Sequence, residues 1–158
     1  MGLAASGFMS CIAVTCLVAA AVDISSRLIP YELCVVLLGF SIAFQISSQG
    51  LLAAIAALGL GLGVSLAMWA IGRVLSRHGK AQAIGAGDTR MTVGVICACG
   101  ASGVIAGSLG FANSFALWFS VAFALGRANR KTQVPMAPFL AVWAISGMAI
   151  PPLAAAFA

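Results

Sequence analysis

Long apolar runs dominate this sequence, and most are about as long as a helix that crosses a lipid bilayer. A helix needs about 20 apolar residues to span the hydrocarbon core. The runs occupy residues 3–22, 31–46, 51–72, 91–125 and 137–158. Of the 158 residues, 63% are hydrophobic and only 7% are charged, whereas a soluble domain carries about 25% charged residues. The chain is therefore predicted to be an all-α, polytopic membrane protein.

The run at residues 91–125 is too long for one span. As a single helix it would measure roughly 50 Å, against a hydrocarbon core of about 30 Å. A turn in the glycine- and serine-rich region 100–110 would divide it into two short helices. The sequence then predicts about six transmembrane helices in one domain, residues 1–158, because no stretch has the composition of a linker. We interpret the first run as a retained helix rather than a signal peptide, since no basic segment precedes it.

The basic residues agree with this helix count. In a six-helix arrangement every Lys and Arg falls in or beside the first, third or fifth loop: Arg27, Arg73, Arg77, Lys80, Arg90, Arg127, Arg130 and Lys131. Loops rich in Lys and Arg stay on the cytoplasmic side of a membrane. Membrane orientation thus explains the net charge of +5, and we do not expect nucleic acid as a partner. The pattern predicts a multi-pass protein of the cytoplasmic (inner) membrane with both termini outside the cytoplasm.

The five cysteines do not indicate a metal or redox site. Cys97 and Cys99 lack the two-residue spacing of zinc and redox motifs, and the chain contains one histidine. Small apolar residues inside helices are the simpler interpretation of these cysteines. We therefore expect no metal and no cofactor.

The only two aspartates fall at the same predicted membrane depth. Asp23 lies where the first helix reaches the cytoplasmic face, and Asp88 lies where the fourth helix leaves that face. Ionisable residues at such positions are costly unless they are paired, hydrated or functional. Two converging carboxylates share one proton, so one serves as a general base toward water and the other as a general acid toward the leaving amine. This is the chemistry of an aspartic peptidase.

A structural explanation of each aspartate stays open. Asp23 would cap a helix end or balance Arg27, and Asp88 would be the N-cap of the fourth helix, because Asp is a favourable N-cap residue. Gly85 and Gly87 precede Asp88. These glycines would allow a substrate strand to approach the backbone closely, but glycines also occur in ordinary loops.

Three segments add a family resemblance. They are DISSRLIP at residues 23–30, in which Pro30 suits the first turn of the second helix; GAGDTRM at residues 85–91; and VPMAPFL at residues 134–140. In this order they resemble the first aspartate motif, the GxGD motif and the Pro-Phe-Gly-Pro-Phe element of type IV prepilin peptidases. The resemblance covers most of the chain. No insert with paired CxxC motifs is present, so the chain is similar to the compact, peptidase-only form of that family.

The resemblance implies an endopeptidase that cuts the leader of a pilin-like precursor on the cytoplasmic side. Asp23 and Asp88 would be catalytic, acting through an activated water. Supporting or substrate-binding roles would fall to Gly85, Gly87, Arg90, Pro30, Arg27 and Pro138. For the two arginines an orientation signal is the alternative interpretation. The expected partners are a pilin-like precursor and the lipid bilayer, and the sequence does not indicate an oligomeric state.

Some positions depart from the family pattern, and other functional classes stay open. Arg90 stands where Lys is commoner, Tyr31 where Asn or Asp is usual, and Ala137 where the family has glycine. One rival class is another GxGD protease, of the presenilin type, although its Tyr-Asp and Pro-Ala-Leu motifs are absent. The other is a non-enzymatic scaffold or a small transporter. A transporter should place polar residues at mid-membrane, and a scaffold would tolerate replacement of either aspartate.

Overall fold

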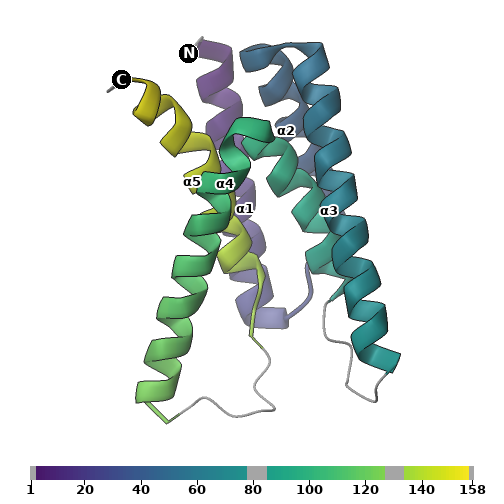
Figure 1. Cartoon of the computed structure of the whole chain (residues 1–158), viewed down its shortest axis with the longest axis vertical. Coiled ribbons are helices and arrows are strands. Elements are labelled where there is room, and N and C mark those ends of the chain that lie inside the picture. The colour runs from purple at the N-terminus through teal and green to yellow at the C-terminus, as the bar shows by residue number, and fades with distance from the viewer. Residues whose placement is uncertain (1–2, 78–84, 127–133, 157–158) are drawn as a thin grey trace.

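Helices form all the regular structure of the described residues, in a computed structural model that covers 3–77, 85–126 and 134–156. Their bounds are α1 Leu3–Ser26, α2 Tyr31–Gln49, α3 Leu51–Arg77, α4 Ala86–Ala124 and α5 Ala137–Ala156. Four of them, α1, α2, α3 and α4, are long and apolar enough to be candidate membrane spans. The bundle in Figure 1 confirms the predicted all-α class.

The predicted count of about six spans is not confirmed. The run expected to form two helices is one element, α4, interrupted at Gly100, where φ is 64° and ψ is 179°. Figure 1 shows the chain reversing direction within α4, so we distinguish a first arm, residues 86–99, from a second arm, residues 101–124. The break lies at the edge of the region in which a turn was predicted. The first arm measures only roughly 20 Å, less than the hydrocarbon core.

Gln45 of α2 supports the break in α4. A reversal inside a membrane protein leaves some backbone N–H and C=O groups without helical partners, and the hydrocarbon holds no water that could hydrogen-bond to them. Gln45 is fully buried and donates a hydrogen bond from Nε2 to the carbonyl oxygen of Ala98 at 3.0 Å. A Cβ at position 100 would lie 2.7 Å from that same Nε2 atom. Glycine meets both demands, because it accepts a positive φ and leaves room for the amide.

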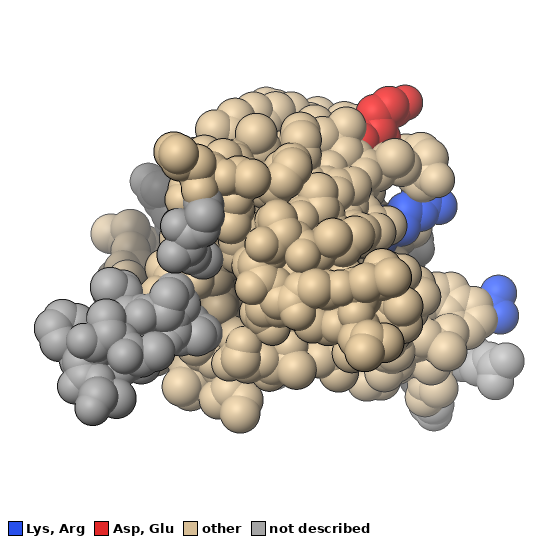
Figure 2. All heavy atoms as spheres, turned by 90° about the horizontal axis from the view of Figure 1, so that it is seen from above, with Lys and Arg blue, Asp and Glu red and all other residues tan. Residues whose placement is uncertain are grey.

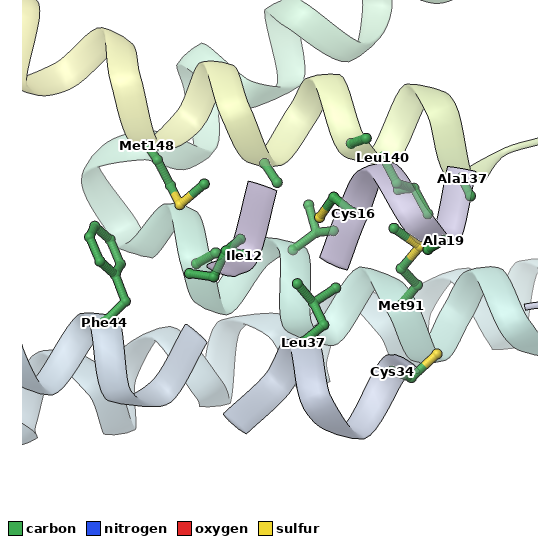
Figure 3. Packing of buried hydrophobic residues seen from close by; sticks show 14 of the residues in the cluster. Ile12, Cys16, Ala19, Cys34, Leu37, Phe44, Met91, Ala137, Leu140 and Met148 are labelled. Carbon is green, nitrogen blue, oxygen red and sulfur yellow. The ribbon is translucent and has the colours of Figure 1, made fainter. Parts of the chain in front are cut away.

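One apolar core joins four of the helices. α1 packs on α2 and α5, while α4 packs on α2, α3 and α5. Figure 3 shows Ile12 and Cys16 of α1, Leu37 of α2 and Leu140 of α5 converging between the helices. Other large apolar side chains stay exposed on the outside, Leu52 of α3 by 83%. Extensive apolar exposure of this kind suits a surface that faces lipid.

Small residues bring the second arm of α4 very close to α5. A Cβ at Gly103 would collide with the carbonyl oxygen of Gly147, and a Cβ at Gly107 would collide with the Trp143 side chain. Close approach through small residues is typical of helix association in membranes. Lipid tails are as apolar as the side chains, so helices there associate through close packing rather than through the hydrophobic effect. We call this packing of Gly103 and Gly107 on α5 the glycine contact.

The two ends of the bundle differ in charge. In Figure 1 both termini and the α2–α3 turn lie at the upper end, whereas the α1–α2 connection and the end of α3 lie at the lower end. The described basic residues Arg27, Arg73, Arg77 and Arg90 belong to segments at the lower end. Figure 2 views the molecule from above and shows charged side chains only at the margin of that face. Lys80, Arg127, Arg130 and Lys131, which entered the orientation argument, lie outside the described residues.

Gly100→Ala should destabilise the protein by about 2–4 kcal/mol, because it combines a positive φ with a Cβ pressed against the Gln45 amide. Thermal unfolding in detergent micelles measures the loss. Gly59→Ala is the matched control, since no atom lies within 4 Å of a Cβ added at Gly59. There alanine should be neutral or stabilising by up to about 1 kcal/mol. Equal melting temperatures for the two variants would show that the break does not depend on glycine.

Candidate active site

Asp23 lies in the last turn of α1 and is almost withdrawn from solvent, with 5% of its surface exposed. Its Oδ2 atom accepts a hydrogen bond of 2.9 Å from the backbone N–H of Ala137, the first residue of α5. The first N–H groups of a helix have no partner inside the helix and carry a partial positive charge. Asp23 therefore caps the start of a different helix, which explains how its carboxylate is accommodated in an apolar bundle.

The first turn of α5 presents the Ala137 donor to Asp23. Pro138, the second residue of α5, has no N–H. The N–H groups of Phe139 and Leu140 both donate to the carbonyl oxygen of Met136, each at 3.1 Å. Pro138, predicted as a supporting residue, thus stands next to the Asp23 contact and is half-buried.

Asp88 lies in the first turn of α4. Gly85 is the N-cap of this helix, so the predicted alternative that Asp88 is itself the N-cap is wrong. Asp88 is the third helical residue, and its carboxylate accepts a backbone hydrogen bond from Gly85. A side chain at this position commonly accepts a hydrogen bond from the N-cap N–H, which has no partner inside the helix. Asp88 is partly exposed, in contrast to Asp23.

The two aspartates lie within electrostatic range of each other. The charge of Asp23 acts unfavourably on the Asp88 carboxyl. The structure joins them through α5, which packs on α1 and on α4 and whose first residue bonds to Asp23. Two like charges that are partly shielded from water repel each other much more strongly than in bulk solvent. Such a pair favours the state in which one carboxyl keeps a proton.

The two glycines before Asp88 make room for parts of this chain. A Cβ at Gly87 would lie 3.1 Å from the Cβ of Ile29, and a Cβ at Gly85 would lie 2.9 Å from Oδ2 of Asp88. Gly87 therefore lets the α1–α2 connection pack against the start of α4, and Gly85 leaves space for the carboxylate. The approach of a substrate strand to these glycines stays a prediction.

The α1–α2 connection carries the other predicted residues. Arg27 follows α1 in a left-handed conformation, with φ 56°, and its N–H donates to the Asp23 carbonyl oxygen at 2.9 Å. Pro30 occupies the N-cap position of α2, one residue before the first helical turn in which it was predicted. The Arg90 guanidinium lies over the Tyr31 ring, 5.6 Å from its centroid. Arg90 thus connects the start of α4 to the start of α2.

Sequence reasoning missed two contacts that hold the site. Ala137 stood out only as a replacement for glycine, whereas its N–H is the partner of Asp23. Ser65 of α3 donates from Oγ to the Thr89 carbonyl oxygen at 2.6 Å and so fixes the first turn of α4. A backbone donor carries no side-chain signature, but the proline that follows Ala137 is a signal of a helix start. Among the described residues, no group of three or more His, Cys, Asp or Glu side chains is placed to hold a metal ion.

Comparison with known proteins found no family model, no curated protein and no solved structure that matches this chain. The resemblance of the three segments therefore stays an expectation drawn from residues 23–30, 85–91 and 134–140.

A double-mutant cycle should detect the repulsion between the aspartates. In Asp23→Asn and Asp88→Asn each change removes the same unfavourable pair, so their effects on the free energy of unfolding should deviate from additivity by about 0.5–1 kcal/mol. The measurement is thermal unfolding of both single variants and the double variant in detergent. Glu32→Gln combined with Asp88→Asn is the control pair, because Glu32 is exposed and water and salt screen an exposed charge. Additive effects in the aspartate cycle would place the two carboxylates too far apart to cooperate.

Proposed function

We propose that this chain is a membrane-embedded aspartic endopeptidase that cleaves the leader of type IV pilin-like precursors. One observation carries the proposal: two carboxylates from separate helix ends lie within electrostatic range of each other in an otherwise apolar bundle. Membrane proteins rarely keep ionisable groups in such places without a use for them. The resemblance of the three segments to prepilin peptidases supports the substrate class.

The aspartate pair supplies every proton transfer that peptide hydrolysis requires. While the oxygen of a water attacks the scissile carbonyl carbon, the ionised carboxylate takes a proton from that water, and the protonated carboxyl donates its own to the carbonyl oxygen. In the second step the newly protonated carboxyl gives its proton to the leaving nitrogen as the C–N bond breaks. The other carboxylate then takes a proton from a hydroxyl of the intermediate. The pair ends with the single proton with which it began.

We place the site at the cytoplasmic face of the inner membrane. Arg27 and Arg90 flank the aspartates in the sequence, and Arg73 lies near the end of α3 at the same end of the bundle. Basic residues of this kind favour the cytoplasmic side. A precursor anchored by its apolar segment would then present its leader to the site from the cytoplasm.

A purely structural role of the aspartates is the second candidate, and specific contacts favour it. Asp23 bonds to the start of α5, and Asp88 bonds back to Gly85. Each bond could by itself account for a carboxylate at its position. In a non-enzymatic scaffold these bonds would be the only role of the two carboxylates. The two candidates separate under isosteric replacement, because Asn keeps an acceptor oxygen and remains a favourable capping residue but has no acid–base function at neutral pH.

Asp23→Asn and Asp88→Asn should each reduce precursor cleavage by at least about 1,000-fold, because each removes one partner of the proton-transfer pair. The measurement is leader loss on a gel after co-expression with a panel of precursors that carry an apolar N-terminal segment behind a short leader. Glu32→Gln, which removes the only other acidic side chain, is the control and should cleave like the wild type. Normal cleavage by both Asn variants would favour the structural role.

Fusions at the C-terminus test the proposed orientation. With both termini outside the cytoplasm, alkaline phosphatase fused after residue 158 should be active and green fluorescent protein at the same place should be dark. Insertion of either reporter after Arg27, in the α1–α2 connection, should give the opposite pair of signals. Phosphatase activity at Arg27 would put the aspartates on the outer face and contradict cleavage from the cytoplasm.

A further inference from the structure

We propose that the backbone N–H of Ala137 is a positioning group for Asp23. In this arrangement α5 holds the Oδ2 atom of Asp23, and the proton transfers of Asp23 fall to Oδ1. The catalytic part of this inference rests on the proposed function. The tether between α5 and the carboxylate does not, and it is measurable in a protein without activity.

The contact has the geometry and the surroundings of a strong hydrogen bond. The N–H of Ala137 lies 2.9 Å from Oδ2, and both residues are buried, Asp23 with 5% and Ala137 with 0% of its surface exposed. Hydrogen bonds to an ionised acceptor are shorter and about twice as strong as neutral ones. Little water competes for either partner here, and a low local dielectric strengthens the bond further.

The donor is itself held in place by packing. Phe139, two residues after Ala137, is buried and meets three aromatic rings from the second arm of α4. Its ring centroid lies 6.3 Å from that of Phe111, 5.4 Å from that of Phe115 and 6.3 Å from that of Trp118. Edge-on contacts of this kind add to the stability that burial provides. The start of α5 is therefore a fixed point against which Asp23 is aligned.

Anchoring one oxygen limits the rotation of the whole carboxylate. An aspartate at the end of a helix can turn about its terminal torsion, which is broad and nearly two-fold. A bond to Oδ2 selects one orientation and keeps Oδ1 directed consistently toward its reaction partners. Catalytic rates are sensitive to misplacements of about 1 Å, so loss of this anchor should affect turnover more than substrate binding.

Ala137→Pro tests the positioning role by removing the N–H, while the ring keeps a backbone angle suited to the first position of a helix. Ala137→Val adds as many side-chain heavy atoms as proline but retains the N–H. With a cleavable precursor in detergent, we expect Ala137→Pro to lower kcat by at least about 30-fold with KM changed less than about two-fold. Ala137→Val should keep a kcat at least about ten-fold above that of Ala137→Pro. Equal kcat values for the two variants, or a loss confined to KM, would overturn the positioning role.

Melting temperatures test the tether without any substrate. Ala137→Pro should lower the melting temperature by roughly 5 °C in the wild-type background. In an Asp23→Leu background the acceptor is already gone, so the same change should lower it by less than about 2 °C. Equal shifts in the two backgrounds would overturn the tether. Unequal shifts in a protein that cleaves none of the precursors would retain the tether and reject the proposed peptidase.

Discussion

Backbone hydrogen bonding is the constraint on which this structure depends. In hydrocarbon each N–H and C=O needs a partner within the protein, so helix interiors form readily and helix ends become the difficult places. Here side chains serve those ends: Gln45 donates to Ala98 near the break in α4, and Asp23 accepts from Ala137 at the start of α5. Buried Asp23 and Gln45 thus partner helix ends, whereas buried Thr15 and Ser41 lie inside helices and donate to the carbonyl oxygen four residues back.

The same constraint relates the structural role of the aspartates to their proposed chemistry. A helix start provides free donors and a partial positive charge, and Asp23 and Asp88 each lie at one, in α5 and in α4. The donors of a helix start therefore help to keep a carboxylate in an apolar bundle. Capping and catalysis do not compete for the same atoms, because a carboxylate has two oxygens and a capping bond uses one.

How much the sequence predicts depends on whether a feature has a side-chain signature. Apolar runs predicted the all-α class because a bilayer leaves few other solutions, and the glycine-rich region 100–110 indicated the reversal that begins at Gly100. The count of about six spans is not confirmed, since the first arm of α4 is short and joins the second in one broken element. The bond between Asp23 and Ala137 was beyond prediction, because it pairs a side chain with a backbone group of a distant helix. Gln45 lay in a stretch interpreted as apolar, and only the packing of α2 on α4 reveals its partner.

The glycine contact has a mechanical consequence. The backbone of α4 lies against the Gly147 carbonyl oxygen at Gly103 and against the Trp143 side chain at Gly107, so the second arm of α4 and α5 cannot slide past each other without separating. The first residue of α5 holds Asp23. Asp88 lies in the first arm, across the break at Gly100. The first arm also meets α5, because Cys99 donates to the Trp143 carbonyl oxygen and would collide with a Cβ at Gly147. α5 thus contacts both the arm that carries Asp88 and the carboxylate of Asp23.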